Sequence, residues 1–106
     1  MICASRWPGA EGVKALKPEE AIPQLRHNEI LASNTLPIWT IYQRPKDYPQ
    51  GYVLRAQWPL EGGLQAIDDI AWYAATADEL RAILPYGLIR MPPDARDDPV
   101  ILEVWI

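Results

Sequence analysis

Residues 37–60 read PIWTIYQRPKDYPQGYVLRAQWPL, and this stretch predicts the centre of the fold. Segments 38–43 and 52–58 are rich in β-branched and aromatic residues, which suit the pleated, half-buried surface of a sheet. Side chains alternate across a strand, so Trp39 and Tyr42 belong to opposite faces of the first segment. The two segments therefore predict neighbouring β-strands.

The connection between these strands carries the residues of a tight turn. Pro49 fits position i+1 of a β-turn, with Tyr48 at position i and Gly51 at position i+3. Pro59 has no N–H to give to a ladder and so ends the second strand. We expect a β-hairpin whose long, stiff connection covers residues 44–51.

Composition and charge limit the classes of protein to consider. The chain has 106 residues, is 49% hydrophobic and contains one cysteine, so we expect one globular domain in a reducing, cytoplasmic compartment. It has no apolar run of membrane-spanning length, and its first residues lack the basic-then-apolar pattern of a secretory signal. A net charge of −4 disfavours nucleic acid as a partner.

The first 36 residues predict an N-terminal extension rather than part of the main domain. Residues 1–17 are interrupted by proline and glycine, which predicts irregular structure. Pro23 is suited to the first turn of a short helix, which could run through Leu31. We therefore divide the chain into an extension, 1–36, and an α+β domain, 37–106.

The segment after the hairpin fits two structures. Ile67, Ile70 and Ala74 fit a helical face, but residues 70–75 also fit a short buried strand. The strand is preferred because an independent helix signal follows it. Asp68 and the aspartate after it are then expected in the loop before this strand.

That helix signal is a capping box. Thr76 is followed three residues later by Glu79. At the start of a helix, the side chain of each can accept a hydrogen bond from the backbone N–H of the other. Leu80 and Leu84 belong to an apolar stripe behind them, and Pro85 ends the pattern. We expect a helix over residues 77–84.

The last seven residues alternate as a final strand, from Val100 to Ile106. The predicted order is β-β-β-α-β, an α+β fold with one helix on one face of a small, mostly antiparallel sheet. We expect that helix to cover the face bearing Trp39, Ile41, Leu54, Leu102 and Val104.

Three segments resemble a family of small bacterial proteins without an established activity. They are WTIYQRPKDYP from Trp39, ADELRAILP from Ala77 and DDPVILEVW from Asp97. Members of that family typically begin near the position of Pro37 and end in a similar strand. The resemblance implies the domain boundary at residue 37, and it gives no activity, cofactor or catalytic residue to carry over to this chain.

Residues that could carry chemistry are few. His27 is the sole histidine, and nothing in the sequence places it beside a nucleophile such as Cys3. The acidic loop with Asp94, Asp97 and Asp98 lacks the glycine and glutamate of a calcium loop, so we expect no metal site. No pattern calls for a cofactor. A small carboxylate-based enzyme remains an alternative.

Aromatic and charged side chains provide the remaining functional signal. The face away from the predicted helix should carry Thr40 and Gln57 together with the candidate binding residues Tyr42, Arg55, Tyr73, Glu103 and Trp105. Tyr, Trp and Arg are enriched at binding hot spots, which predicts a non-enzymatic protein-interaction module, possible also as a homodimer. The same aromatic residues beside Arg55 would alternatively suit single-stranded nucleic acid. Two other arrangements would account for these residues without a binding partner. Arg55 and Glu103 could pair across strands, or the N-terminal extension could fold over this face.

Overall fold

The computed structural model describes residues 14–44, 48–63, 65–91 and 101–106. The described elements are, in chain order, β1 (Lys14–Leu16), α1 (Pro23–Ala32), β2 (Ile38–Gln43), β3 (Tyr52–Pro59), the 3-10 turn η2 (Glu61–Gly63), β4 (Gln65–Ala74), α2 (Ala77–Arg81), β5 (Arg90–Met91) and β6 (Ile101–Trp105). The strands form one sheet in the order β1-β4-β3-β2-β6-β5, in which β1 and β4 are parallel and all other pairs are antiparallel.

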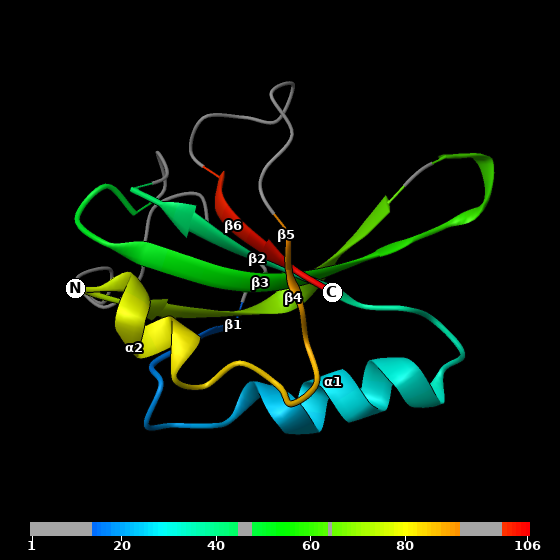
Figure 1. The fold of residues 1–106 in the computed structure, drawn as a ribbon, viewed down its shortest axis with the longest axis horizontal. Helices are drawn as coiled ribbons and strands as arrows, with labels where there is room; N and C mark the ends of the chain where they lie inside the picture. Colours follow the sequence, from blue (N-terminus) through cyan, green and yellow to red (C-terminus); the bar gives the residue numbers. More distant parts are fainter. Residues whose placement is uncertain (1–13, 45–47, 64, 92–100) are drawn as a thin grey trace.

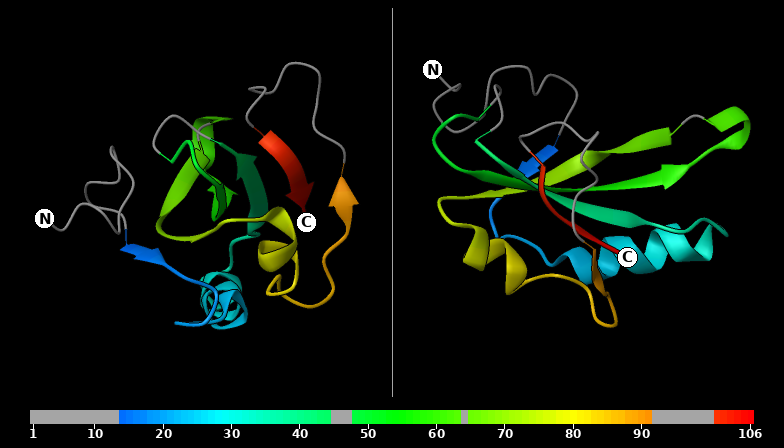
Figure 2. Two further views of the ribbon diagram at one scale, coloured as in Figure 1. Left: turned by 90° about the vertical axis from the view of Figure 1, so that its left-hand side faces the viewer. Right: turned by 45° about the horizontal axis from the view of Figure 1, so that its top comes forward.

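Both helices lie on the same side of this sheet, as Figures 1 and 2 show. The predicted α+β class with a mostly antiparallel sheet is confirmed, but the sheet carries two helices rather than one. We call the side that packs against α1 and α2 the helix-side face and the other side the opposite face. Among the described helices none is long and apolar enough to cross a bilayer.

The predicted hairpin is confirmed. Strand β2 pairs with β3 along its whole length, from Ile38 to Gln43. The N–H of Gly51 donates to the carbonyl oxygen of Tyr48 at 3.4 Å, which closes the predicted turn. A side chain at Gly51 would place its Cβ 2.5 Å from the carbonyl oxygen of Ala74, so the turn requires glycine. Residues 45–47 of the connection lie outside the described residues.

The segment after the hairpin is a strand, as preferred, and it is longer than expected. Strand β4 includes Asp68 and Asp69, so their placement in a preceding loop was wrong. The pairing of β3 with β4 shifts between Arg55 and Gln57, which marks a bulge at these aspartates. Two arginines hold the bulge: Arg26 of α1 bonds the Asp68 carboxylate at 2.8 and 2.9 Å, and Arg55 Nε bonds the Asp68 carbonyl oxygen at 2.6 Å.

The capping box at the start of α2 is confirmed. Glu79 N–H donates to the hydroxyl of Thr76, and the Glu79 carboxylate accepts from Thr76 N–H at 3.1 Å. The helix ends at Arg81 rather than residue 84, because the next bonds tighten: Ile83 N–H donates to Leu80 O, three residues back. Leu80 is fully buried against the sheet.

The segment before residue 37 contributes two elements to this assembly. Residues 14–16 form β1, which corrects the expectation of irregular structure over residues 1–17. Helix α1 begins at Pro23, as predicted. Two core tryptophans reach toward this segment: Trp39 Nε1 donates to His27 Nδ1 at 3.0 Å, and Trp72 Nε1 donates to Ala21 O at 3.0 Å. Buried indole N–H groups need such partners, so the tryptophans fix where the segment docks.

The core lies between the helices and the helix-side face. Trp39 and Trp72 pack at its centre with ring centroids 5.9 Å apart, and Leu54 and Leu80 are fully buried beside them. Leu102 is half-buried but contacts the same core. The expected burial is therefore confirmed for Trp39, Leu54 and Leu80.

Candidate functional site

Three of the five predicted binding residues come together on the opposite face. Directly paired residues of neighbouring strands project from the same side of a sheet. Tyr42 pairs with Val53, and Val53 pairs with Tyr73, so these side chains form one row. Arg55 lies in the adjacent row, paired with Thr40 on one side and with Ala71 on the other.

The placement of Glu103 and Trp105 on this face was wrong. Trp105 pairs with Trp39 and Glu103 pairs with Ile41, so both belong to the helix-side face. Val104 pairs with Thr40 and projects from the opposite face, contrary to expectation. The alternation in β6 is equally compatible with either orientation. The register of β6 shifts between Ile41 and Tyr42, so Ile101 pairs with Tyr42 on the opposite face while Leu102 contacts the core. Glu103 lies on the helix side, where it meets a counter-charge.

That counter-charge is Arg81 of α2. Its Nε lies 2.8 and 3.0 Å from the two carboxylate oxygens of Glu103, and its Nη2 also bonds Glu103. Trp105 Nε1 donates to Glu103 Oε1 at 3.0 Å. The Arg81 bond holds the pKa of the Glu103 carboxyl below its usual value, although burial opposes this. Glu103 and Trp105 thus join α2 to β6 instead of forming a binding surface.

The residues that do share the opposite face are held in place by one another. Gln57 Nε2 donates to the Tyr42 hydroxyl at 2.6 Å. Tyr48 packs edge-on against Tyr73, with ring centroids 5.3 Å apart. Burial, followed by the proximity of Tyr73 and Glu79, raises the pKa of the Tyr48 hydroxyl. Contacts within the chain therefore position Tyr42 and Tyr73 on this face.

Apolar side chains that sequence reasoning missed extend the same face. Ile67 pairs with Gln57, which in turn pairs with Ile38, so Ile67 lies on the opposite face. Met91 pairs with Val104 and lies on the same face. Ile67 is 55% exposed and Met91 is 42% exposed. The missing signal was register: neither residue can be assigned to a face until its strand partner is known.

Two charges belong to the described strands of this face. Arg55 is half-buried there. Asp69 is exposed and stands between Asp68 and Ile70, which both contact the helix side, so alternation directs it to the opposite face. The two charges have opposite sign and cancel.

The other candidate residues are structural or lie outside the description. His27 is buried in α1, and burial lowers the pKa of its imidazole, so the neutral ring accepts the Trp39 N–H. Within the described ranges, no three His, Cys, Asp or Glu side chains gather as metal ligands do. Cys3 and the acidic loop with Asp94, Asp97 and Asp98 fall on residues that are not described.

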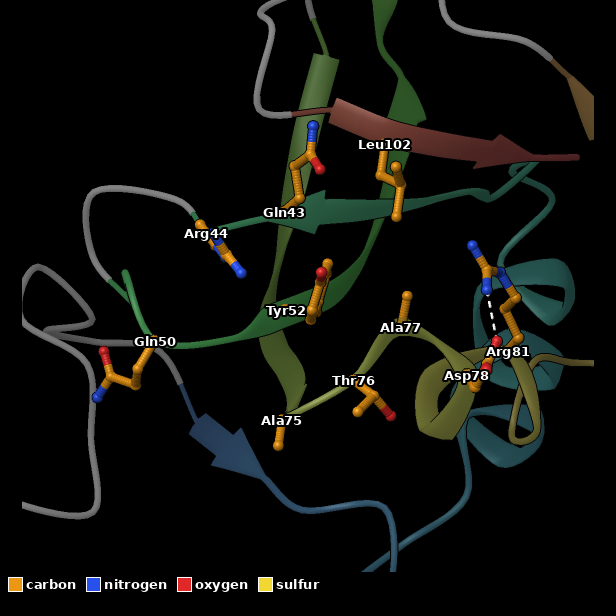
Figure 3. Close-up of a pocket in the computed structure, with 10 residues that line it drawn as sticks. All are labelled: Gln43, Arg44, Gln50, Tyr52, Ala75, Thr76, Ala77, Asp78, Arg81 and Leu102. Carbon is orange, nitrogen blue, oxygen red and sulfur yellow. Dashed lines mark hydrogen bonds and ion pairs between the residues drawn. The ribbon is translucent and has the colours of Figure 1, made fainter.

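A cavity of about 380 Å³ opens on the helix side, between the end of the hairpin and the start of α2 (Figure 3). Its walls include Arg44 and Tyr52 from the hairpin and Asp78 and Arg81 from the helix. None of the residues singled out by the sequence as binding candidates lines it.

Comparison with models of protein families, with curated proteins and with solved structures found no match for this chain. The resemblance of its segments to a family of small bacterial proteins stays a prediction.

Proposed function

We propose that the protein is an interaction module that associates with a second copy of itself through the opposite face. One observation carries this proposal: both described helices cover the same side of the sheet, and the other side presents apolar side chains such as Ile67, at 55% exposure. A two-layer fold stabilises only the face that its second layer covers. Exposed apolar side chains on an ordered face are typical of interaction sites.

The composition of the face supports a protein partner. Tyr42, Arg55 and Tyr73 are of residue types enriched at the centre of interfaces. Their contacts with Gln57, Asp68 and Tyr48 reduce the side-chain entropy that binding would otherwise cost. Ile67 and Met91 extend this centre with apolar area whose burial stabilises a complex.

Charge supports a second copy as that partner. The chain carries a net charge of −4, so most approaches of two copies are repulsive. On the opposite face, the charges of Arg55 and Asp69 cancel. In a two-fold dimer the same patch meets itself, so a face with one cation and one anion can pair each with its opposite.

The alternatives receive less support from the geometry. Base stacking on Tyr42, Tyr73 and Trp105 would need all three rings on one face, and Trp105 lies on the other. A carboxylate-based enzyme would need a reactive acid, whereas Asp68 and Glu103 are each bound by an arginine. A cytoplasmic location belongs to our proposal, because a single cysteine cannot form an internal disulfide.

Sedimentation across a dilution series tests the proposal. We expect the full chain to sediment as a dimer that dissociates within about 1–100 µM, the range of a modest affinity. Ile67→Asp places a charge in the interface and should give a monomer at all these concentrations. Leu25→Asp is the matched control, because Leu25 is 65% exposed on α1, on the other side of the sheet. Circular dichroism would establish that both variants fold.

A wild-type chain that stays monomeric throughout the series would contradict the proposal. So would a folded Ile67→Asp variant that still dimerises, or a Leu25→Asp variant that alone becomes monomeric.

A further inference from the structure

The cavity between the hairpin and α2 contains an arginine in an unusual backbone conformation. Arg44 has a φ of 45°, in the left-handed region that side chains other than those of Gly, Asn and Asp seldom adopt. Asn34 also has a positive φ, but it is an asparagine that follows Ser33, the C-cap of α1, and such residues are common at this position. A hydrogen bond of 2.8 Å from Arg44 N–H to Gly51 O fixes the strained backbone. Gly or Asn would adopt this backbone conformation at a lower cost. A strained residue of another type is often found at a functional site.

The side chain of Arg44 lines the cavity. Figure 3 shows it directed from the end of β2 into the cavity, on the same side as Tyr52. Within the described residues, the Arg44 guanidinium has no hydrogen-bond or ion-pair partner, and the Tyr52 hydroxyl has no hydrogen-bond acceptor or donor. Two groups that can donate hydrogen bonds therefore face the same space.

The other arginine of the cavity is fully engaged. Arg81 bonds Glu103 through Nε and Nη2, and its Nη1 lies 2.5 Å from Asp78 Oδ1, the bond drawn in Figure 3. These two carboxylates compensate the Arg81 charge. Arg44, which is exposed, lies at the other end of the cavity and has no such carboxylate partner among the described residues.

We propose that this cavity binds a small organic monocarboxylate, with the Arg44 guanidinium as its counter-charge. The planar fork of an arginine matches the two oxygens of a carboxylate. The Tyr52 hydroxyl can donate a further hydrogen bond, and Ala77 and Leu102 provide apolar wall for the body of the ligand. A dianion such as phosphate is disfavoured, because Asp78 lines the same cavity and, among the described residues that line it, Arg44 alone is a cation without an ion-pair partner.

Nuclear magnetic resonance titration of the full chain with acetate, butyrate and benzoate tests this site. We expect saturable shifts of the Arg44 side-chain N–H and of the backbone N–H groups of Gly51 and Thr76, with dissociation constants of about 1 mM or below for the best probe. Benzamide, the uncharged counterpart of benzoate, and inorganic phosphate should bind at least about tenfold more weakly, a difference of about 1.4 kcal/mol.

Two variants separate binding from folding. Arg44→Gly and Arg44→Asn relieve the backbone strain and remove the charge, so they should fold with an unchanged or higher melting temperature while losing at least about tenfold in carboxylate affinity. Lys17→Gln is the control, because it removes an exposed positive charge that does not line this cavity and should leave binding unchanged.

Three results would overturn the site. They are an absence of shifts at the cavity with all three carboxylates, equal binding of benzoate by the Arg44→Gly variant, and phosphate binding tighter than that of every carboxylate. The cavity lies on the helix side, so its variants should not alter sedimentation, and the outcome is independent of the proposed self-association.

Discussion

His27 is a residue whose protonation the fold opposes. It is buried, its Nδ1 accepts the indole N–H of Trp39 at 3.0 Å, and burial lowers the pKa of the imidazole below 6.5. A protonated ring would carry N–H at Nδ1 and could no longer accept this bond. The sequence predicted no partner for His27, since the bond joins a helix to a strand through tertiary packing.

This arrangement predicts a dependence of stability on pH. The unfolded chain binds a proton at His27 first, so the free energy of unfolding should fall as pH drops through 6.5 toward the folded pKa, by at most about 1.4 kcal/mol per pH unit. His27→Asn keeps an acceptor for Trp39 but does not titrate. Urea unfolding at several pH values between 7 and 5 should show this slope in the wild type and lose it in the variant. Equal slopes in both proteins would refute the assignment.

At the scale of elements, one arginine–carboxylate pair joins each helix to a strand. Arg26 of α1 bonds Asp68 of β4, and Arg81 of α2 bonds Glu103 of β6. Both carboxylates are almost completely buried, whereas the arginines keep contact with solvent. A buried carboxylate that loses its partner is strongly destabilising, so these pairs fix the positions of the helices.

The Arg81 pair can be measured by a double-mutant cycle. Arg81→Met should lower the free energy of unfolding by up to about 3–5 kcal/mol, because the buried Glu103 carboxylate keeps no more than the long ion pair with Arg90, at 3.9 Å, among the described residues. In a Glu103→Gln background, where the amide oxygen can still accept from Trp105, the same substitution should cost much less. Equal costs in the two backgrounds would show that the pair does not couple α2 to the sheet.

Low pH should weaken the stabilising contribution of the Arg81–Glu103 pair. The pKa of Glu103 is lowered by Arg81, so the pair stabilises the fold above the unfolded pKa, near 4.5, and this contribution is lost as pH falls through the lower folded value. The Glu103→Gln variant should lack this part of the acid transition in the same unfolding measurement.

Local signals decided which elements could be predicted. The hairpin and the start of α2 follow from neighbours in sequence, namely Pro49 with Gly51 and Thr76 with Glu79. Strands β1 and β5 have three and two residues, too few for a pattern, and they depend on pairing with distant segments. The candidate site shows the same division between local and distant signals. Alternation along the strands was enough to place Tyr42, Arg55 and Tyr73 on one face. It was not enough for Glu103, because the side of that residue depends on the register of β6 with β2.

At the scale of the molecule, the arrangement is asymmetric about the sheet. Both described helices lie on one side, and the cavity with Arg44 lies on that side as well. Two exposed apolar residues, Ile67 and Met91, belong to the opposite side, and Leu25 and Leu31 of α1 are exposed on the helix side. The chain has a net charge of −4. Self-association through the opposite side would bury Ile67 and Met91 where the charges of that face cancel.

The most direct test of this account is an isotope-filtered nuclear Overhauser experiment on an equimolar mixture of labelled and unlabelled chains. This measurement detects only contacts between copies. We predict intermolecular contacts from the methyl groups of Ile67, Met91 and Val104, and none from Leu25 on α1. Intermolecular contacts confined to Leu25 and the helix side, or none at a concentration where the chain is dimeric, would contradict the assignment of the opposite face as the interface.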